Sequence, residues 1–347
     1  MRIGVAGVGR IGAIHAGTLA GLPEVDTVVI ADADPARARE VATELAGPAR
    51  IEVATGTAHL LASGVDGLVV AAATDAHLSL THDGIAAGVP VFCEKPVARD
   101  LVETIALADR IEGTGAYVQV GFQRRFDVGY VAARAAVRSG ELGWVHTMRA
   151  GTLDAAPPPA AYIASSGGLF RDCSVHDLDI VAWVTGREIV EVYARGCNHG
   201  AAFFAAAGDV DAAAALVSLD DGSFAHLAAG RYNARGYDVR LEVLGSLDSI
   251  AVGLDDQLPL RSVQPGVGFP SGPPVQTFLD RFAAAYTAEL RAFVARVADG
   301  GPSPCTVRDA VAATAAAEAC ELSRAEHRPV GLAEVLATAA VAAEAVR

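Results

Sequence analysis

Cysteine is scarce in this sequence, and the cysteines present follow no metal-binding or disulfide pattern. The five residues are widely spaced and odd in number, and none belongs to a Cys-x-x-Cys pair: Cys93, Cys173, Cys197, Cys305 and Cys320. A disulfide framework needs paired cysteines, and a structural zinc site needs closely spaced ones. We therefore expect reduced, mostly buried thiols and no bound metal.

Clusters of positive charge and long apolar runs are also missing. The chain has 27 Lys and Arg against 41 Asp and Glu, a formal net charge of −14. Phosphate binding depends on local positive charge, so nucleic acid is not expected as a partner. No apolar run approaches the roughly 20 residues of a membrane-spanning helix, so no membrane association is expected. A strand pattern begins at Arg2 and leaves no room for a signal peptide, so we expect a cytoplasmic protein.

The first third of the chain alternates strand and helix patterns, as α/β proteins do. A length of 347 residues suits two domains of about 150 residues each. Short β-branched runs alternate with longer helical stretches, and they lie at residues 3–6, 28–31, 68–71, 89–93 and 117–120. Such alternation is typical of βαβ units around a parallel sheet. We expect a Rossmann domain over residues 1–121.

The remainder, residues 122–347, has a different order of expected strands and helices. Extended runs follow one another directly, at residues 144–150, 189–195, 213–219, 223–232 and 239–244. Asp221-Gly222 between two of these runs predicts a tight hairpin. We expect an α+β domain with a largely antiparallel open sheet that binds substrate and pairs with another copy of the chain. Helices are expected at residues 278–297 and in the Ala-rich tail, and loops at residues 157–159 and 265–274.

A glycine motif follows the first expected strand. Residues 7–12 read Gly-Val-Gly-Arg-Ile-Gly, and a helical pattern begins directly after them. Gly7 permits a tight turn, Gly9 lets a pyrophosphate approach the backbone, and Gly12 allows close packing of helix on strand. This context predicts a dinucleotide site at the start of the helix, with Arg10 and Ile11 in the same turn. The competing interpretation is a purely structural glycine-rich turn.

Asp32 ends the second expected strand, twenty residues after Gly12. A carboxylate at this place can accept hydrogen bonds from the ribose hydroxyls of NAD. It would repel the 2′-phosphate of NADP, and the next two residues, Ala33 and Asp34, supply no arginine to compensate. The sequence therefore predicts NAD as the cofactor, with NADP binding less well.

Two further segments carry the chemistry of a dehydrogenase. Glu94-Lys95-Pro96 follows a strand and so lies at the carboxyl edge of the parallel sheet, where such folds bind ligands. Asp172 and His176 are four residues apart in a helical pattern, which places them on one face. A histidine titrates near neutral pH and can accept a proton from an alcohol as hydride leaves the same carbon. Lys95 could also be a solvated surface lysine, and the Asp172–His176 pair could be structural.

With these motifs the chain resembles the glucose-fructose oxidoreductase and inositol dehydrogenase (Gfo/Idh/MocA) family. The resemblance extends over nearly the whole chain and, among subfamilies, is nearest to the myo-inositol 2-dehydrogenases. Besides the glycine motif it rests on Phe-Cys-Glu-Lys-Pro at 92–96, Val-Gly-Phe-Gln-Arg-Arg-Phe-Asp at 120–127, Asp172 with His176-Asp177 before Trp183, Gly-Tyr-Asp at 236–238, and Arg-Phe-Ala-Ala-Ala-Tyr at 281–286.

The resemblance implies roles for individual residues. Lys95, Asp172 and His176 would form the catalytic set between the domains, with His176 as proton acceptor, Asp172 orienting it, and Lys95 bonded to the reacting oxygen. Other positions would surround the cofactor and the substrate. On this basis Thr74, His77 and Glu94 join the cofactor site, and Arg124, Asp154 and Tyr237 line the substrate pocket, although Arg124 could also be a surface ion-pair partner and Tyr237 a core residue.

One departure from the family pattern concerns the substrate. Residues 152–157, Thr-Leu-Asp-Ala-Ala-Pro, lie where inositol dehydrogenases usually carry an Arg-Asn-Pro-like stretch. We expect an NAD-dependent dehydrogenase that oxidises a secondary hydroxyl of a cyclic polyol to a ketone, with a pyranose sugar as the alternative substrate. Two other interpretations remain: a glycosidase or epimerase that recycles tightly held NAD, and a non-catalytic NAD-binding sensor. Members of the family are commonly homodimers or homotetramers, so we expect a homo-oligomer.

Overall fold

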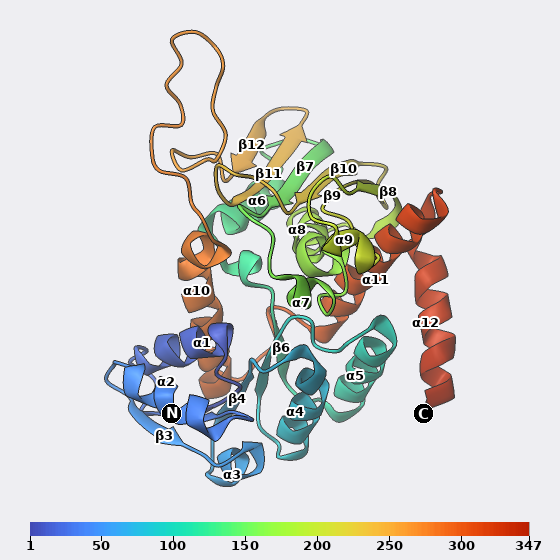
Figure 1. The fold of residues 1–347 in the computed structure, drawn as a ribbon. Coiled ribbons are helices and arrows are strands. Elements are labelled where there is room, and N and C mark those ends of the chain that lie inside the picture. Colours follow the sequence, from blue (N-terminus) through green and yellow to red (C-terminus); the bar gives the residue numbers. More distant parts are fainter. Residues whose placement is uncertain (347) are drawn as a thin grey trace. The chain divides into compact units, whose positions relative to one another are not determined.

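The structure is a computed structural model that describes residues 1–346. The chain forms two compact units (Figure 1). The first comprises Met1–Phe126, Ala284–Val311 and the residues from Ala339 onward, and the second comprises Asp127–Ala283 and Ala312–Thr338. The expected division was a single cut after residue 121. In the structure, two later stretches of chain belong to the first unit as well.

A six-stranded parallel sheet forms the centre of the first unit, in the order β3-β2-β1-β4-β5-β6. The strands are β1 (Arg2–Ala6), β2 (Thr27–Ala31), β3 (Arg50–Val53), β4 (Gly67–Val70), β5 (Val91–Glu94) and β6 (Val118–Gly121). The helices between them are α1 (Arg10–Ala20), α2 (Pro35–Glu44), α3 (Thr57–Ala62), α4 (Thr74–Ala86) and α5 (Leu101–Thr114). This order confirms the predicted Rossmann fold, and the strand order reverses between β1 and β4, where such sheets bind ligands.

The central strands are apolar because helices cover both faces of the sheet. Ile3, Val5 and Ile30 are fully buried. The edge strand β3 differs, because its sequence Arg-Ile-Glu-Val has no fully buried residue. That polar composition explains why β3 was not predicted from the sequence.

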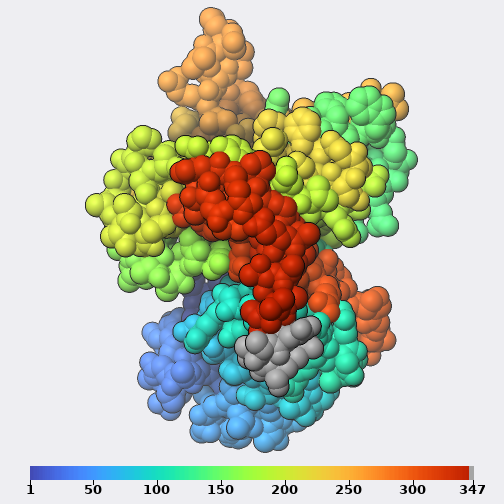
Figure 2. Space-filling view, turned by 90° about the vertical axis from the view of Figure 1, so that its right-hand side faces the viewer, coloured from blue at the N-terminus to red at the C-terminus, as the bar shows by residue number. Residues whose placement is uncertain are grey.

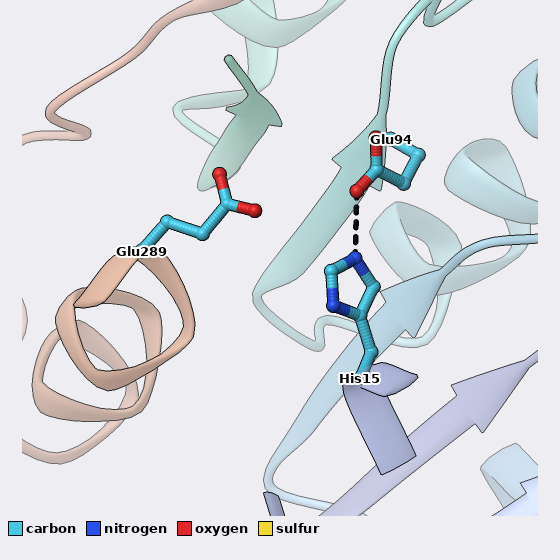
Figure 3. Close-up of side chains that lie close together, drawn as sticks. All are labelled: His15, Glu94 and Glu289. Carbon is cyan, nitrogen blue, oxygen red and sulfur yellow. Dashed lines mark hydrogen bonds and ion pairs between the residues drawn. The ribbon is translucent and has the colours of Figure 1, made fainter. Parts of the chain in front are cut away.

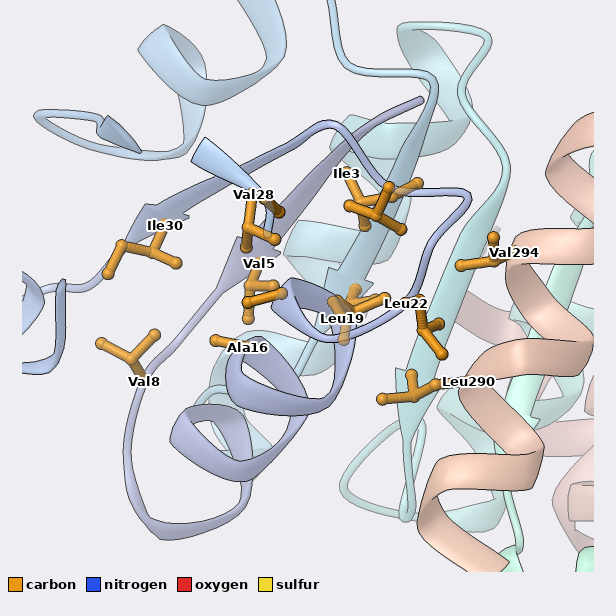
Figure 4. Packing of buried hydrophobic residues seen from close by; sticks show 14 of the residues in the cluster. Ile3, Val5, Val8, Ala16, Leu19, Leu22, Val28, Ile30, Leu290 and Val294 are labelled. Atoms are coloured by element: carbon orange, nitrogen blue, oxygen red, sulfur yellow. The ribbon is translucent and has the colours of Figure 1, made fainter. Parts of the chain in front are cut away.

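A helix from near the end of the chain completes the core of the first unit. Leu290 and Val294 of α10 (Phe278–Asp299) pack in the same buried cluster as Leu19 and Leu22 (Figure 4), and Phe293 belongs to this cluster as well. Each such side chain contributes about 1.5–3 kcal/mol when it leaves water. This packing is the physical reason why the first unit is not one continuous stretch of sequence.

The second unit is built on a seven-stranded sheet in the order β12-β11-β7-β10-β9-β8-β13. Its strands are β7 (Val145–Leu153), β8 (Ile189–Cys197), β9 (Ala212–Leu219), β10 (Phe224–Gly230), β11 (Asp238–Gly245), β12 (Ser249–Val252) and β13 (Val330–Gly331). All pairs are antiparallel except β10 with β7, which confirms the expected largely antiparallel sheet. The predicted hairpin joins β9 to β10, with Gly222 at φ +85°.

Helices pack against one face of this sheet, and the other face is open. Along β10 the exposed Phe224 and His226 alternate with the buried Ala225 and Leu227. The helical elements that the structure describes in the rest of the chain are α6 (Val128–Ser139), α7 (Ala160–Ile163), a π-helical turn (Phe170–Ser174), α8 (Val175–Thr185), α9 (Phe203–Ala206), α11 (Val307–Glu326) and α12 (Leu332–Val346), together with a 3₁₀ turn (Gln123–Phe126) in the first unit.

Residues 253–277 form an arm that extends from the second unit (orange in Figures 1 and 2). The arm is rich in proline and glycine, as expected for residues 265–274, and it exposes Leu254, Val263 and Val267. All five cysteines are free thiols, and four of them are buried, as expected of the cysteine side chains. No helix within residues 1–346 is long and apolar enough to cross a membrane.

Candidate active site

The glycine loop joins β1 to α1 in the first unit. Gly7 has a φ of +90°, and a β-carbon there would collide with the backbone of Ala72. A β-carbon on Gly12 would collide with the carbonyl oxygen of Gly7. Around Gly9, by contrast, nothing lies within 4 Å of the β-carbon position. The loop is therefore tightly packed at its two ends and open at its centre, as close approach of a ligand's phosphates requires.

The first turn of α1 is suited to an anion. Its N-cap is Gly9, no side chain caps it, and it contains no acidic residue. Arg10 is exposed at the first helical position, followed by the half-buried Ile11. The positive end of the helix dipole thus lies beside the open centre of the loop.

Asp32 is held beside this loop directly after β2. Its Oδ2 accepts a hydrogen bond from the N–H of Val8 at 2.8 Å, and its Oδ1 accepts one from the N–H of Asp34 at 2.9 Å. Arg37 of α2 also reaches the loop, because its Nε donates to the carbonyl oxygen of Val8 at 3.3 Å. Sequence reasoning considered only the two residues after Asp32 and so missed this arginine. The loop, the helix end and the carboxylate together fit an NAD molecule.

His77 supports the backbone next to Lys95. Its Nδ1 lies 2.7 Å from the carbonyl oxygen of Pro96, and its Nε2 lies 3.0 Å from that of Ala72. Carbonyl oxygens only accept, so both ring nitrogens must donate and the ring is an imidazolium. Burial alone would lower the pKa of His77, but the Cys93 sulfur and the two carbonyls together raise it to about 9. Its expected contact with the cofactor stays a prediction, as does that of Thr74, which is exposed at the first position of α4.

The end of β5 carries Glu94 and Lys95, both partly buried. The Oε1 atom of Glu94 lies 2.6 Å from Nε2 of His15, and its Oε2 accepts from the backbone N–H of Lys95 at 3.2 Å. Both oxygens of Glu94 thus have partners within the protein. The expected contact of Glu94 with the cofactor is untested, whereas its link to Lys95 is direct.

Arg124 and Arg125 lie in the 3₁₀ turn after β6. Arg124 is 1% exposed and Arg125 is 7% exposed, so neither is a solvated surface residue. Arg125 forms an ion pair with Asp309 at 3.2 Å. The expected contact of Arg124 with substrate stays a prediction.

In the second unit, Asp172 and His176 occupy two different kinds of helix. Asp172 lies in the π-helical turn Phe170–Ser174, and His176 lies in the first turn of α8. The sequence predicted a single α-helix, because periodicity does not distinguish i→i+4 from i→i+5 hydrogen bonding over so short a stretch. Such π turns within helices are frequent at functional sites. His176 is 8% exposed.

A buried arginine joins two of the expected site residues. Arg231 is 2% exposed, and its guanidinium contacts Oδ2 of Asp154 at 2.8 Å and Oδ2 of Asp172 at 2.7 Å. Burial would lower the pKa of Arg231, but Cys173 and the two carboxylates raise it above its ordinary value. Sequence reasoning missed Arg231. The parallel pairing of β10 with β7 places residues 231 and 154 at the same end of the sheet, and no sequence motif signals that pairing.

Tyr162 of α7 completes this cluster. Its hydroxyl donates to Oδ1 of Asp172 at 2.8 Å, and burial together with the nearby charge of Asp172 raises the pKa of Tyr162. Both oxygens of Asp172 are therefore held in place. Tyr237, the other expected substrate residue, is 8% exposed and meets the ring of Phe278 edge-on at 6.4 Å between centroids.

Comparison with known proteins gives family matches for two segments of the chain. Residues 1–122 match the family model described as an oxidoreductase family with an NAD-binding Rossmann fold, and residues 130–251 match the GFO/IDH/MocA C-terminal domain. The chain belongs to the GFO/IDH/MocA oxidoreductase family. The resemblance inferred from the sequence motifs, the oxidoreductase class and the NAD-binding Rossmann fold are thereby confirmed.

Relatives within the family match nearly the whole chain. A myo-inositol dehydrogenase of Streptomyces leeuwenhoekii is 42% identical over 325 residues, covering 93% of this chain and 97% of that protein. The crystal structure of a myo-inositol dehydrogenase from Corynebacterium glutamicum superposes with a TM-score of 0.87 at 33% identity, covering 96% of this chain and 98% of that one. A scyllo-inositol dehydrogenase from Lactobacillus casei, crystallised with NAD(H) and scyllo-inositol, gives a TM-score of 0.82 at 30% identity and covers 96% of this chain and 99% of that one.

Proposed function

We propose that this chain is an NAD-dependent dehydrogenase that oxidises a secondary hydroxyl of an inositol-like cyclic polyol to a ketone. The support is the nearly full-length similarity to inositol dehydrogenases of this family. The observation in this chain that carries the proposal is the fixed array of Asp154, Arg231, Asp172 and Tyr162. A ring with adjacent hydroxyls needs several preorganised donors and acceptors, and this array supplies them.

Three side chains have separate roles at the reacting alcohol. His176 accepts the hydroxyl proton, because imidazole titrates near neutral pH. Asp172 orients that imidazole and contacts a substrate hydroxyl, and its own position is fixed by Arg231 and Tyr162. Lys95 hydrogen-bonds the oxygen that becomes the carbonyl, and its ammonium stabilises negative charge there. Bound NAD supplies the carbon that accepts the hydride.

The residues of the proposed cofactor site all belong to the first unit. Gly7, Gly9 and Gly12 with the first turn of α1 hold the diphosphate, and Arg10 and Ile11 belong to that turn. Asp32 holds the adenosine ribose. Thr74, His77 and Glu94 shape the neighbouring loops, with His77 and Glu94 acting on the backbone around Lys95.

Substrate choice depends on Asp154, Arg124 and Tyr237. The segment around Asp154 departs from the usual Arg-Asn-Pro-like stretch, and a pyranose sugar remains the second candidate substrate.

The deciding experiment measures initial rates of NAD reduction with inositol isomers and common aldoses, repeated with NADP and with a His176→Ala variant. Reduction by an inositol that is lost in the variant supports the proposal. Reduction only by aldoses selects the sugar, and no net reduction by any compound, with NAD still bound after dialysis, contradicts it in favour of cofactor recycling or sensing.

We also propose that the open face of the second-unit sheet pairs with a second copy of the chain. Strand register aligns one residue from each of five strands across this face, namely Tyr193, Leu216, His226, Arg149 and Glu242. Apolar and charged groups of both signs thus lie on one surface, which suits a self-complementary contact. A dimer or tetramer is the expected assembly. The cytoplasmic location stays a prediction.

A further inference from the structure

Three titratable side chains meet in the interior of the first unit. His15 comes from α1, Glu94 from the end of β5 and Glu289 from α10 (Figure 3). One nitrogen or oxygen atom from each lies within 4.8 Å of the others. His15 and Glu289 are both fully buried. The roles proposed above assign nothing to either of them.

Glu94 is fixed from three sides. Its Oε1 is 2.6 Å from Nε2 of His15, and its Oε2 accepts from the backbone N–H of Lys95 at 3.2 Å. Its carboxyl carbon lies so near Gly121 that a β-carbon on this glycine would be 3.0 Å from it. A movement of Glu94 would therefore be transmitted to the backbone of Lys95.

Glu289 points at this pair without bonding to it. Its carboxyl group is directed toward His15 and Glu94 (Figure 3), and neither oxygen has a hydrogen-bond partner within residues 1–346. The surroundings are aromatic, because Phe92 and Tyr286 meet the His15 ring edge-on. Burial and then the charge of Glu94 raise the pKa of Glu289 well above its ordinary value.

We propose that Glu289 is a positioning residue: as a neutral carboxylic acid it leaves Glu94 the only negative charge of the cluster, so that Glu94 holds the backbone of Lys95. The inference rests on the proposed role of Lys95 in the reaction. A second buried carboxylate would repel Glu94, and two like charges this close do not both ionise readily. Tyr286 and Lys95 also border the cluster, through the ring contact with His15 and the backbone hydrogen bond to Glu94.

The same three side chains could instead ligate a divalent cation. The contact between His15 and Glu94 argues for the proton, because 2.6 Å between donor and acceptor is a hydrogen bond that these two atoms make with each other. A metal ion would require both atoms to turn toward it. Metal binding is accordingly an outcome that would overturn the proposal.

Infrared spectroscopy of the full chain tests the protonation state directly. The wild type at neutral pH should show the C=O band of a protonated carboxylic acid, shifted in D₂O, and Glu289→Gln should lose it. Glu44→Gln, which alters an exposed carboxylate of α2 in the same unit, should keep it. A missing band in the wild type, or metal that copurifies at one equivalent and leaves with Glu289→Gln, overturns the proposal. This readout does not depend on turnover, so it separates failure here from failure of the proposed dehydrogenase activity.

Kinetics test the link to Lys95. Glu289→Ala should lower kcat by about tenfold, and Glu289→Gln, a neutral group of the same shape, should restore most of it at neutral pH. In Glu289→Gln the alkaline fall of kcat should move upward by about one pH unit or more, because no acid at position 289 can ionise. An alkaline limb at the same pH as in the wild type would show that Glu289 is only structural.

Discussion

Asp32 and Arg37 act on the same few atoms of the glycine loop. The carboxylate accepts from the N–H of Val8, and the guanidinium donates to the carbonyl oxygen of that residue. An arginine at this place can pair with the 2′-phosphate of NADP once the carboxylate is gone. We therefore expect the choice between NAD and NADP to depend on both side chains.

Replacing Asp32 with serine should shift this balance toward NADP. We expect kcat/KM with NADP to rise by about tenfold or more relative to NAD, because a repulsion between two negative charges is removed. The double variant Asp32→Ser/Arg37→Met is the matched control and should lose most of that gain. An equal rise of kcat/KM with NADP in both variants would show that Arg37 does not bind the 2′-phosphate.

Arg231 holds two carboxylates that would otherwise repel each other. Arg231→Met should lower the free energy of unfolding by about 3–5 kcal/mol, because the carboxylates of Asp154 and Asp172 would lose the buried cation that balances their charge. Urea unfolding measures the change. Arg187→Met, which breaks an exposed ion pair with Asp221, should cost less than about 1 kcal/mol. Similar losses in the two variants would contradict the buried role of Arg231.

At the scale of elements, His77 of α4 ties the end of β4 to the turn after β5. Its pKa of about 9 in the folded chain lies above the ordinary value of 6.5, so the stabilisation is complete below pH 6.5 and is lost as the pH rises through 9. Relative to His77→Gln, the wild type should lose up to about 3 kcal/mol of unfolding free energy over that range. His59→Gln, which changes an exposed histidine of α3, is the matched control. If the difference in unfolding free energy between the wild type and His77→Gln stayed constant from pH 6 to 9, it would contradict the imidazolium assignment.

The elements also show what the sequence could predict. The other five strands of the first unit were predicted because they are short apolar runs that are almost entirely buried. The edge strand β3 and the π turn at Asp172 were not, since polar composition and a single wider turn leave no periodic signal. Single residues of the site were predicted where a motif encloses them, as with Lys95. Arg231 lies 59 positions from Asp172 in the chain, Glu289 lies 195 from Glu94 and 274 from His15, and only the fold brings these residues together.

At the scale of the whole molecule, the open sheet face predicts the assembly. We expect sedimentation at micromolar concentration to give a mass of at least twice 35.4 kDa. Leu216→Glu places a charge in the middle of this face and should shift the mass toward that of one chain. Leu247→Glu is the control, because Leu247 is exposed in the turn between β11 and β12. A wild-type mass of 35.4 kDa would contradict the assembly.

The first unit begins at Met1 yet takes part of its core from Leu290, Phe293 and Val294. During translation the six strands leave the ribosome first, while the helix that covers Leu19 and Leu22 is still unmade. Because closing so long a loop must wait for synthesis, the nascent sheet keeps an apolar surface exposed for most of that time. A ribosome that stalls or a message that ends before residue 290 therefore releases a product with the complete nucleotide motif and an uncovered core, which is what chaperones and proteases recognise.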